Sequence, residues 1–274
     1  MLFGNASWGF RETPLEKQLE ITSEMGLELL ELGIANAPSD LPLDVTDSEL
    51  SDVKELFGKY KIKLLCAATG NDFTTGNRDD VAKIKRVVDI CEKLGIRYLR
   101  IFAGFTPVEE VVGEKWDIMT ECLNEVYAYA KEKNVVPVVE THGGVNGFDD
   151  GVEHFYSTSS KPEALLKMID EVPDIMINYD PANLYAVGIE NPEEVYDKIK
   201  SKVCYVHLKD FVKLPGGHLL PAACGESDMN WKNILLQLKD FSGPALFEYE
   251  NVGDVKEGCE RCYEYIKKIL KEIN

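Results

Sequence analysis

Four apolar segments in the second half of the sequence each end in side chains that can bind a metal ion or carry a proton. In order along the chain, these side chains are Glu140, His142, Asp180, His207, Lys209, Glu248 and Glu250. An ionisable group at the end of an apolar segment costs free energy unless it is paired, hydrated or bound to a metal. Because the feature recurs on four successive segments, it indicates one shared polar site.

The alternation of side chains along a strand selects which of these groups share a face. Successive side chains of a strand point to opposite faces, so each acid or histidine shares its face with the residue two positions earlier. The side chains expected to converge on one point are Glu140, Asp180, His207 and Glu248. Three carboxylates and one imidazole form a hard, oxygen-rich donor set, which suits Mn²⁺, Mg²⁺, Co²⁺ or Fe²⁺ better than a structural zinc ion.

This donor set predicts a particular class of reaction. A divalent ion could chelate a carbonyl and a neighbouring hydroxyl of a substrate, and stabilise the enediolate formed when a proton leaves the carbon between them. Glu140 and Glu248 could take and return that proton. Return on the other face gives epimerisation, return at the next carbon gives isomerisation, and loss of a β-hydroxyl gives dehydration. The candidates for binding substrate oxygens are His142, Asn183, Lys209 and Lys213.

The elements that must position these residues alternate along the whole chain. The eight segments that predict strands are Phe3–Ser7, Glu28–Gly33, Lys63–Thr69, Tyr98–Ala103, Val135–His142, Ile175–Asp180, Val203–Lys209 and Pro244–Glu250. Between them, apolar residues recur every three to four positions, as in helices that pack one face on a sheet. Capping-box patterns at Thr13–Glu16 and Thr46–Glu49 mark two helix starts. Eight strand–helix units without a Gly-rich linker predict an α/β fold, a single (β/α)8 TIM barrel that forms one domain over residues 1–274.

Two connections are longer than the others, residues 143–160 and residues 211–228. Both follow predicted strands, and the connections that follow strands lie at the catalytic face of a barrel. Long loops in a compact domain often act as lids or binding loops. We therefore expect both to border the site, with Trp8, Phe148 and Tyr156 as candidate aromatic walls.

Composition excludes several classes of partner. The net charge is −18, from 30 basic and 48 acidic residues, so the chain would repel nucleic acid and an anionic membrane surface. The seven cysteines are an odd number and mostly lie in apolar segments, which is typical of small core residues in a reducing compartment. Cys259 and Cys262 have redox spacing but lie within a helical pattern. The N-terminus lacks the order of a signal peptide and no apolar segment approaches membrane-spanning length, so we expect a cytoplasmic protein.

The sequence resembles the xylose isomerase-like barrels, the sugar phosphate isomerase/epimerase group that includes ketose 3-epimerases, hydroxypyruvate isomerase and inosose dehydratase. The motifs that carry the resemblance are Val138–Glu140, Tyr179–Asn183, Val206–Asp210 and Leu246–Glu250. Weaker similarity extends over the whole chain and includes Leu29–Gly33. The usual Gly-Glu-Gly after the seventh strand of the family is Gly-Glu-Ser at residues 225–227 here.

The resemblance implies a set of roles for the same residues. In the family one Glu, one Asp, one His and a last Glu bind a divalent metal, and by position these are Glu140, Asp180, His207 and Glu248. The two glutamates are then also the acid and base. The resemblance further implies one bound ion (Mn favoured over Mg, Co, Fe or Zn), a small sugar or cyclitol substrate, and a possible homo-oligomer.

Other interpretations of these residues and of the chain remain open. Glu140 and Glu248 could form structural ion pairs, Asp180 could be a turn residue, His207 a core histidine and Lys209 a counter-ion to the acids. At the level of function, the alternatives are a dehydratase of a keto-inositol or similar substrate, a non-catalytic sugar-binding barrel, and an apurinic endonuclease. The endonuclease activity needs about three metal ions and many more histidine ligands than the four histidines of this chain.

Overall fold

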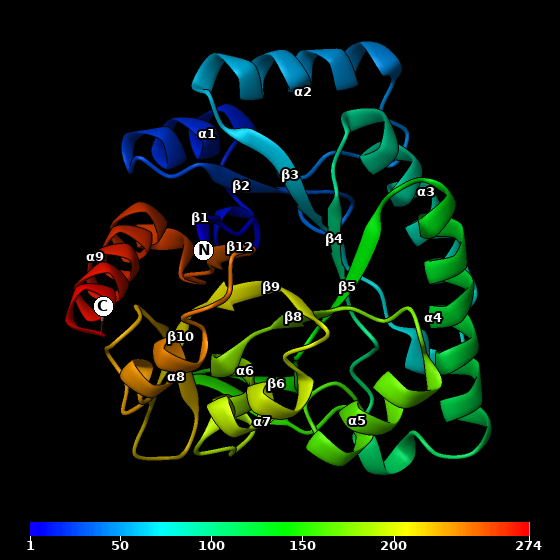
Figure 1. The fold of residues 1–274 in the computed structure, drawn as a ribbon, viewed down its shortest axis with the longest axis vertical. Helices are drawn as coiled ribbons and strands as arrows, with labels where there is room; N and C mark the ends of the chain where they lie inside the picture. Colours follow the sequence, from blue (N-terminus) through cyan, green and yellow to red (C-terminus); the bar gives the residue numbers. More distant parts are fainter. Residues whose placement is uncertain (274) are drawn as a thin grey trace.

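A computed structural model describes residues 1–273 of the chain. Eight strands close into a barrel in the order β1–β12–β9–β8–β5–β4–β3–β2, and every neighbouring pair is parallel (Figure 1). The barrel strands are β1 (Leu2–Asn5), β2 (Leu29–Gly33), β3 (Lys63–Ala68), β4 (Tyr98–Ile101), β5 (Val136–Glu140), β8 (Ile177–Tyr179), β9 (Val203–Leu208) and β12 (Pro244–Phe247). The predicted TIM barrel and its eight strands are confirmed. Most strands end one to three residues earlier than predicted, so several polar candidates lie just beyond a strand end.

The helices form an outer ring around these strands (Figure 1). They are α1 (Leu15–Glu24), α2 (Asp47–Tyr60), α3 (Asp79–Leu94), α4 (Glu114–Glu132), α5 (Pro162–Glu171), α6 (Pro181–Ala186), α7 (Pro192–Ile199), α8 (Trp231–Gln237) and α9 (Val255–Ile273). The capping box at Thr46 is confirmed, because its hydroxyl accepts from Glu49 N–H and the Glu49 carboxylate accepts from Thr46 N–H. The cap predicted at Thr13 is wrong. Pro14 occupies the N-cap position with extended backbone, and no side chain caps this helix.

The core has two parts, which follow from the alternation along the strands. One small cluster fills the barrel interior and contains Ala6, Leu29, Cys66, Val138, Tyr205 and Leu246. The larger cluster packs the outward faces of the strands against the helices. Three members of this interior cluster each lie two positions before a predicted site residue, namely Val138, Tyr205 and Leu246. The prediction of which side chains of these strands point into the barrel is therefore confirmed.

A second sheet forms from the two long connections, which were expected to be loops. Its strands, in the order β10–β11–β7–β6, are β10 (Asp210–Lys213), β11 (Leu219–Ala222), β7 (Gly151–Phe155) and β6 (Gly144–Phe148). Each connection folds into an antiparallel hairpin, and pairing of Leu219 with Val152 joins the two. Each hairpin is short and contains glycine or proline, so the alternation of apolar and polar residues that marks a strand is weak in it. The sheet is completed only by contact between connections that are far apart in the sequence.

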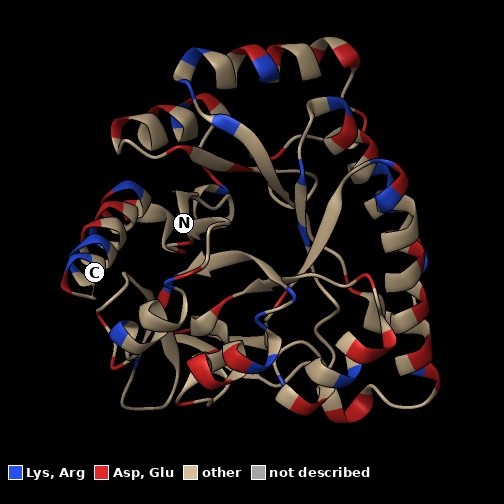
Figure 2. Cartoon of the chain, viewed as in Figure 1, with Lys and Arg blue, Asp and Glu red and all other residues tan. Residues whose placement is uncertain are grey.

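Charged residues lie mainly on the outer helices, where acidic and basic positions are interspersed (Figure 2). Six of the seven cysteines are buried and Cys204 is partly exposed, and all seven are free thiols, as expected for core residues. Within residues 1–273, no helix is both long and apolar enough to cross a membrane.

Candidate metal and active site

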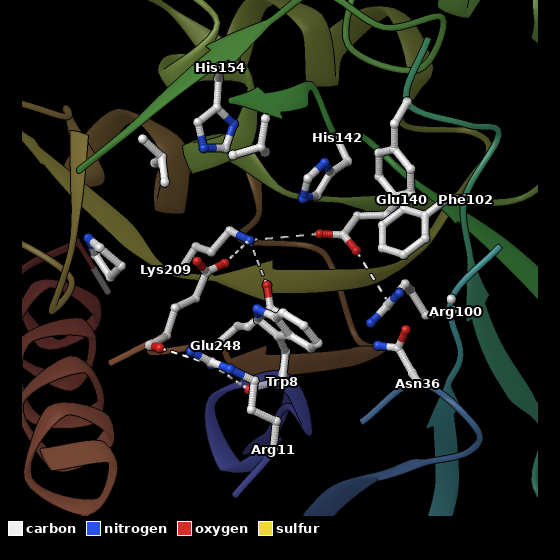
Figure 3. Close-up of a pocket in the computed structure, with 16 residues that line it drawn as sticks. Trp8, Arg11, Asn36, Arg100, Phe102, Glu140, His142, His154, Lys209 and Glu248 are labelled. Atoms are coloured by element: carbon white, nitrogen blue, oxygen red, sulfur yellow. Dashed lines mark hydrogen bonds and ion pairs between the residues drawn. The ribbon is translucent and has the colours of Figure 1, made fainter. Parts of the chain in front are cut away.

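A cavity of about 500 Å³ opens at the carboxyl ends of the barrel strands (Figure 3). Glu140 at the end of β5, Lys209 just after β9 and Glu248 just after β12 line it. Residues of the second sheet also border it, including Val145, Val152 and His154, and the two long connections are therefore beside the site as expected. The barrel supplies the charged groups, and the inserted sheet supplies an apolar wall.

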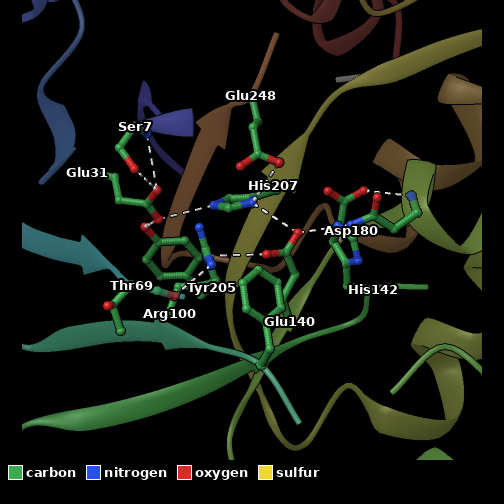
Figure 4. Close-up of polar contacts among 12 residues, drawn as sticks. Ser7, Glu31, Thr69, Arg100, Glu140, His142, Asp180, Tyr205, His207 and Glu248 are labelled. Atoms are coloured by element: carbon green, nitrogen blue, oxygen red, sulfur yellow. Dashed lines mark hydrogen bonds and ion pairs between the residues drawn. The ribbon is translucent and has the colours of Figure 1, made fainter. Parts of the chain in front are cut away.

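Four predicted ligands come together beside this cavity. One potential ligand atom from each of Glu140, Asp180, His207 and Glu248 lies within 4.8 Å of the others, and all four side chains are buried. His207 Nδ1 is 3.5 Å from Glu140 Oε1 and 3.4 Å from Glu248 Oε2 (Figure 4). Two ligand atoms that are each about 2.1 Å from one ion at a tetrahedral angle are about 3.4 Å apart, so these spacings suit a shared ion.

Two buried atoms of this cluster accept no hydrogen bond, which is the observation that fits a metal ion best. They are Asp180 Oδ2 and His207 Nδ1. Buried polar atoms nearly always have a hydrogen bond, so an oxygen and a nitrogen that lack one beside two carboxylates form a suitable place for a cation. The other oxygen of Asp180 accepts from Asn183 N–H at 3.0 Å and caps α6. Asp180 is therefore a turn residue through one oxygen and a potential ligand through the other.

His207 is held from behind by Glu31, which we did not predict as a site residue. Glu31 Oε2 is 3.3 Å from His207 Nε2 and accepts from the Tyr205 hydroxyl at 2.7 Å (Figure 4). Its Oε1 accepts from the backbone N–H and the hydroxyl of Ser7 at 3.1 and 3.0 Å. Burial lowers the pKa of His207, but Glu248, Glu140 and Glu31 raise it well above its usual value, so both ring nitrogens carry protons when no ion is bound. A bound cation would replace the proton on Nδ1, which faces the other ligands, while Nε2–H still donates to Glu31. Burial raises the pKa of Glu31, but the charge of His207 lowers it more, to about 2.

Glu140 is held on both of its oxygens. Asn183 Nδ2 donates to Oε1 at 2.9 Å, and Arg100 Nε lies 3.3 Å from Oε2. Arg100 is itself buried, donates to the carbonyl of Thr69 and lies over the Phe102 ring at 4.3 Å. Burial raises the pKa of Glu140, but His207 and Arg100 lower it by a larger amount, so the pKa lies below its ordinary value. Asn183, which we predicted to contact substrate, therefore positions Glu140 and is fully buried.

Lys209 joins the carboxylates into one network. Its ammonium is 2.6 Å from Glu248 Oε2, 2.8 Å from Glu250 Oε1 and 3.4 Å from Asp180 Oδ2. Burial lowers the pKa of Lys209, but the nearby carboxylates raise it well above its usual value, so the side chain is a cation. Burial raises the pKa of Asp180 to about 7, against the lowering effect of Lys209. Lys209 is thus a counter-ion to the acids and also lines the cavity.

Glu248 differs from Glu140 in having a free oxygen. Its Oε2 accepts from Lys209, whereas no residue among 1–273 donates a hydrogen bond to its Oε1. Burial raises the pKa of Glu248, but Lys209 and His207 lower it more, to about 2. Glu248 therefore presents a carboxylate oxygen to the cavity that can accept a proton from a ligand.

The remaining predicted contacts divide between cavity and surface. His142 lines the cavity, packs edge-on against Phe102 at 5.3 Å, and its Nδ1 contacts the carbonyl of Gly143. Trp8 lines the cavity as expected, but Phe148 and Tyr156 are not among its lining residues. Lys213 lies exposed at the end of β10 and does not reach the cavity, because β10 leads away from the barrel as part of the hairpin.

Two functional residues were missed although each leaves a signal in the sequence. Glu31 lies within Leu-Leu-Glu-Leu of β2, and Arg100 lies within Tyr-Leu-Arg-Ile of β4. A single charged residue inside a buried strand needs a partner in the interior. β2 and β4 carry only one such residue each, so neither stood out beside the acid-rich ends of the later strands.

The connection that contains Gly225 is fixed in place by Asp210. Asp210 Oδ2 accepts from Gly225 N–H and from Trp231 Nε1, both at 2.9 Å. Gly225 has φ +90°, and a Cβ there would lie 2.4 Å from the ring of Tyr265, so only glycine fits. The Ser in place of the second family glycine, at position 227, is accommodated, and its hydroxyl accepts from Met229 N–H.

Comparison with known proteins agrees with this architecture. Among solved structures, the probable 3-DHS dehydratase AsbF from Bacillus anthracis superposes with a TM-score of 0.79 at 14% identity, covering 97% of this chain and 99% of that one. D-allulose 3-epimerase from Methylomonas sp. gives 0.72 at 15%, covering 98% of both chains. The IolI protein with a bound zinc atom gives 0.79 at 19%, covering 99% of both. At these identities the likeness shows a shared fold.

The sequence itself also matches a family. No curated protein sequence matches the chain. The model of the xylose isomerase-like TIM barrel family, in contrast, matches residues 19–269, a segment that contains all four candidate ligands. The chain therefore belongs to the xylose isomerase-like TIM barrel family.

Proposed function

We propose that this protein is a divalent-metal-dependent isomerase or epimerase that acts on a sugar or a related hydroxy-carbonyl compound. The observation that carries the proposal is the convergence of Glu140, Asp180, His207 and Glu248 beside a cavity at the carboxyl end of the barrel. These four residues would hold the ion, and Mn²⁺ or a similar hard ion suits them. A divalent ion bound there supplies Lewis-acid stabilisation of negative charge on the carbonyl and hydroxyl oxygens of the substrate.

The two glutamates have different surroundings and therefore different tasks. Glu248 has a free oxygen at the cavity and accepts the proton from the carbon next to the carbonyl. Glu140 is held by Asn183 and Arg100, so its position is fixed and it returns a proton or orients the substrate on the other side. A pair of carboxylates that face one substrate from two sides is the arrangement that proton transfer between faces or carbons requires.

Lys209 and His142 would orient the substrate. The Lys209 ammonium donates to Glu248 and faces the cavity, so it can also donate to an oxygen on the reacting carbon. His142 is half-buried in the cavity wall, where the pKa of its imidazole is lowered by burial, and it is therefore neutral. A neutral imidazole can donate or accept one hydrogen bond with a sugar hydroxyl.

The test is exchange of carbon-bound hydrogen. The metal-loaded protein is incubated in D₂O with ketoses, 3-keto sugars and keto-inositols, and the carbon-bound protons are followed by NMR. We expect exchange at a carbon next to a carbonyl and a loss of at least about 100-fold in Glu248→Gln. The matched control is Glu132→Gln, the same change at an exposed position at the end of α4, which should exchange at the wild-type rate.

The outcomes separate the candidate reactions. A product that differs in configuration identifies an epimerase, and one with a moved carbonyl identifies an isomerase. A dehydrated product would instead identify a dehydratase, the reaction named for one of the similar structures. Exchange that survives in Glu248→Gln would refute the role of this residue, and absence of exchange with unchanged metal content in His207→Ala would favour a non-catalytic barrel.

An apurinic endonuclease is the less supported alternative. Within residues 1–273, one group of four potential ligand residues comes together, whereas that activity needs about three ions. The net charge of −18 also opposes binding to a phosphate backbone. Incision of a duplex that contains an abasic site should therefore be absent, and observed incision would overturn the isomerase proposal.

A further inference from the structure

The cavity is larger than the sugar unit that the proposed reaction requires. Its volume is about 500 Å³. A hexose contains six CHOH-type units, each about the size of one water molecule (~30 Å³), and therefore occupies about 180 Å³. When such a unit reaches Glu140, Lys209 and Glu248, roughly 300 Å³ remains unfilled.

The remaining space is bordered by side chains that are wholly or largely apolar. They come from segments outside the barrel strands and are Trp8, Phe105, Val145, Val152 and Pro221. Three of them belong to the inserted sheet, namely Val145 on β6, Val152 on β7 and Pro221 on β11. Figure 3 shows the two parts of the cavity, with Glu140, Lys209 and Glu248 on the barrel side and the wall that carries His154 opposite.

A second sugar unit would suit this wall poorly. Each hydroxyl left unpaired against an apolar surface weakens binding about tenfold. On the inserted sheet, His154 is the polar lining residue, and its Nδ1 is buried without a partner. Apolar surface in the ligand, in contrast, stabilises the complex because that surface leaves water.

The charges that line the cavity do not call for an anionic group. Three carboxylates, Glu140, Glu248 and Glu250, are matched by three cations, Arg11, Arg100 and Lys209. Arg11 is already engaged, because its Nη1 donates to the carbonyls of Trp8 and Glu250 and its guanidinium lies over the Trp8 ring at 4.9 Å. Arg100 and Lys209 are likewise paired with carboxylates, and none of the three cations lies on the inserted sheet, so this wall favours a neutral substituent over a phosphate or carboxylate.

We propose that the natural substrate is a conjugate in which the reacting hydroxy-carbonyl sugar carries a neutral, apolar substituent, such as an aryl or alkyl glycoside. The inserted sheet, through Val145, Val152 and Pro221, forms the subsite for that substituent. This inference rests on the proposed function for the sugar half, but the subsite itself can be tested by binding alone.

The first test compares ligands that differ only in the substituent. Methyl and phenyl glycosides of glucose, galactose and mannose are titrated into the Mg²⁺-loaded protein, with Trp8 fluorescence as the readout. Trp8 lines the cavity, whereas the other two tryptophans, Trp116 and Trp231, are buried in the core. We expect the phenyl glycoside of at least one sugar to bind about tenfold or more tightly than its methyl counterpart.

A matched pair of variants assigns this preference to the inserted sheet. The double variant Val145→Thr/Val152→Thr replaces one methyl by a hydroxyl on each side chain and should lower the phenyl-to-methyl affinity ratio about fivefold. Val112→Thr makes the same change at a valine that is 65% exposed and outside the cavity, and should leave the ratio unchanged. No phenyl preference with any of the three sugars, or a preference that persists in the double variant, would overturn the proposal.

Hydrogen exchange distinguishes failure of this inference from failure of the proposed function. If 3-keto-glucose and its phenyl glycoside exchange with equal kcat/KM, the function stands and the subsite is refuted. If phenyl glycosides bind tightly, lose this preference in the double variant and show no exchange as keto sugars, the subsite stands and the isomerase proposal fails.

Discussion

Replacing Glu31 by Gln should weaken metal binding without altering any ligand. The two residues have the same size, but glutamine has one oxygen where glutamate has two. In the native protein each carboxylate oxygen accepts two hydrogen bonds, Oε1 from Ser7 and Oε2 from Tyr205 and His207. One of these pairs must therefore face an NH₂ group in the variant.

The lower-energy orientation directs that NH₂ group toward His207. The backbone N–H of Ser7 can only donate, so Oε1 must remain an oxygen. The Tyr205 hydroxyl can rotate to accept, and His207 can accept at Nε2 only if it gives up the proton there and keeps the one on Nδ1. Because Nδ1 is the atom that faces Glu140 and Glu248, a proton there blocks the candidate metal position.

The expected magnitude follows from the hydrogen bond that is lost. A hydrogen bond to a charged group contributes about 1.5–3 kcal/mol, which corresponds to roughly a 10- to 100-fold increase in the Kd for the metal. Competition of Mn²⁺ or Co²⁺ with a fluorescent chelator at pH 7.5 measures this change. The ¹⁵N chemical shifts of His207 in the metal-free protein provide a second readout, with both nitrogens protonated in the wild type and Nδ1 alone protonated in the variant.

Two controls keep this prediction falsifiable. Glu28→Gln makes the same change at the exposed glutamate before β2, and should leave metal affinity unaltered. Tyr205→Phe removes the other donor to Glu31 Oε2 without forcing the His207 tautomer, and its Kd should stay within about threefold of wild type. An unchanged Kd in a folded Glu31→Gln variant would refute the reasoning.

Three further predictions address stability and the loops. Thr46→Ala removes the capping box of α2 and should lower the free energy of unfolding by about 1 kcal/mol in urea titrations, while an unchanged midpoint would contradict the cap. Asp210→Ala should speed amide hydrogen exchange in residues 223–229, because it removes the oxygen that accepts from Gly225 N–H and from Trp231 Nε1. Equal exchange would show that other contacts hold this connection. Burial lowers the pKa of His154 to about 3, whereas its pKa in the unfolded chain is about 6.5. Between these values the unfolded state binds a proton that the folded state does not, so the free energy of unfolding falls as the pH drops from 6.5 toward 3. Between pH 7.5 and pH 5, the free energy of unfolding of His154→Gln should therefore fall by about 1–2 kcal/mol less than that of the wild type. Parallel curves of unfolding free energy against pH would exclude this contribution.

The barrel and the convergence of the four candidate ligands could be predicted from the sequence because both follow from local, periodic signals. Alternation of strand and helix patterns determines the parallel sheet. Within a strand, every second side chain faces inward, as Val138 and Tyr205 show. Glu140 and His207 follow from the same rule, since each lies two positions further along its strand.

Tertiary structure alone decided the surroundings of those ligands. Glu31 and His207 are 176 positions apart, and no local pattern can show that two isolated polar residues in apolar strands will meet. The second sheet likewise depends on pairing between residues 152 and 219, which belong to hairpins from different connections. Short-range periodicity thus determined which elements form and which faces turn inward, whereas contacts across the barrel determined how each ligand is held and what the cavity can admit.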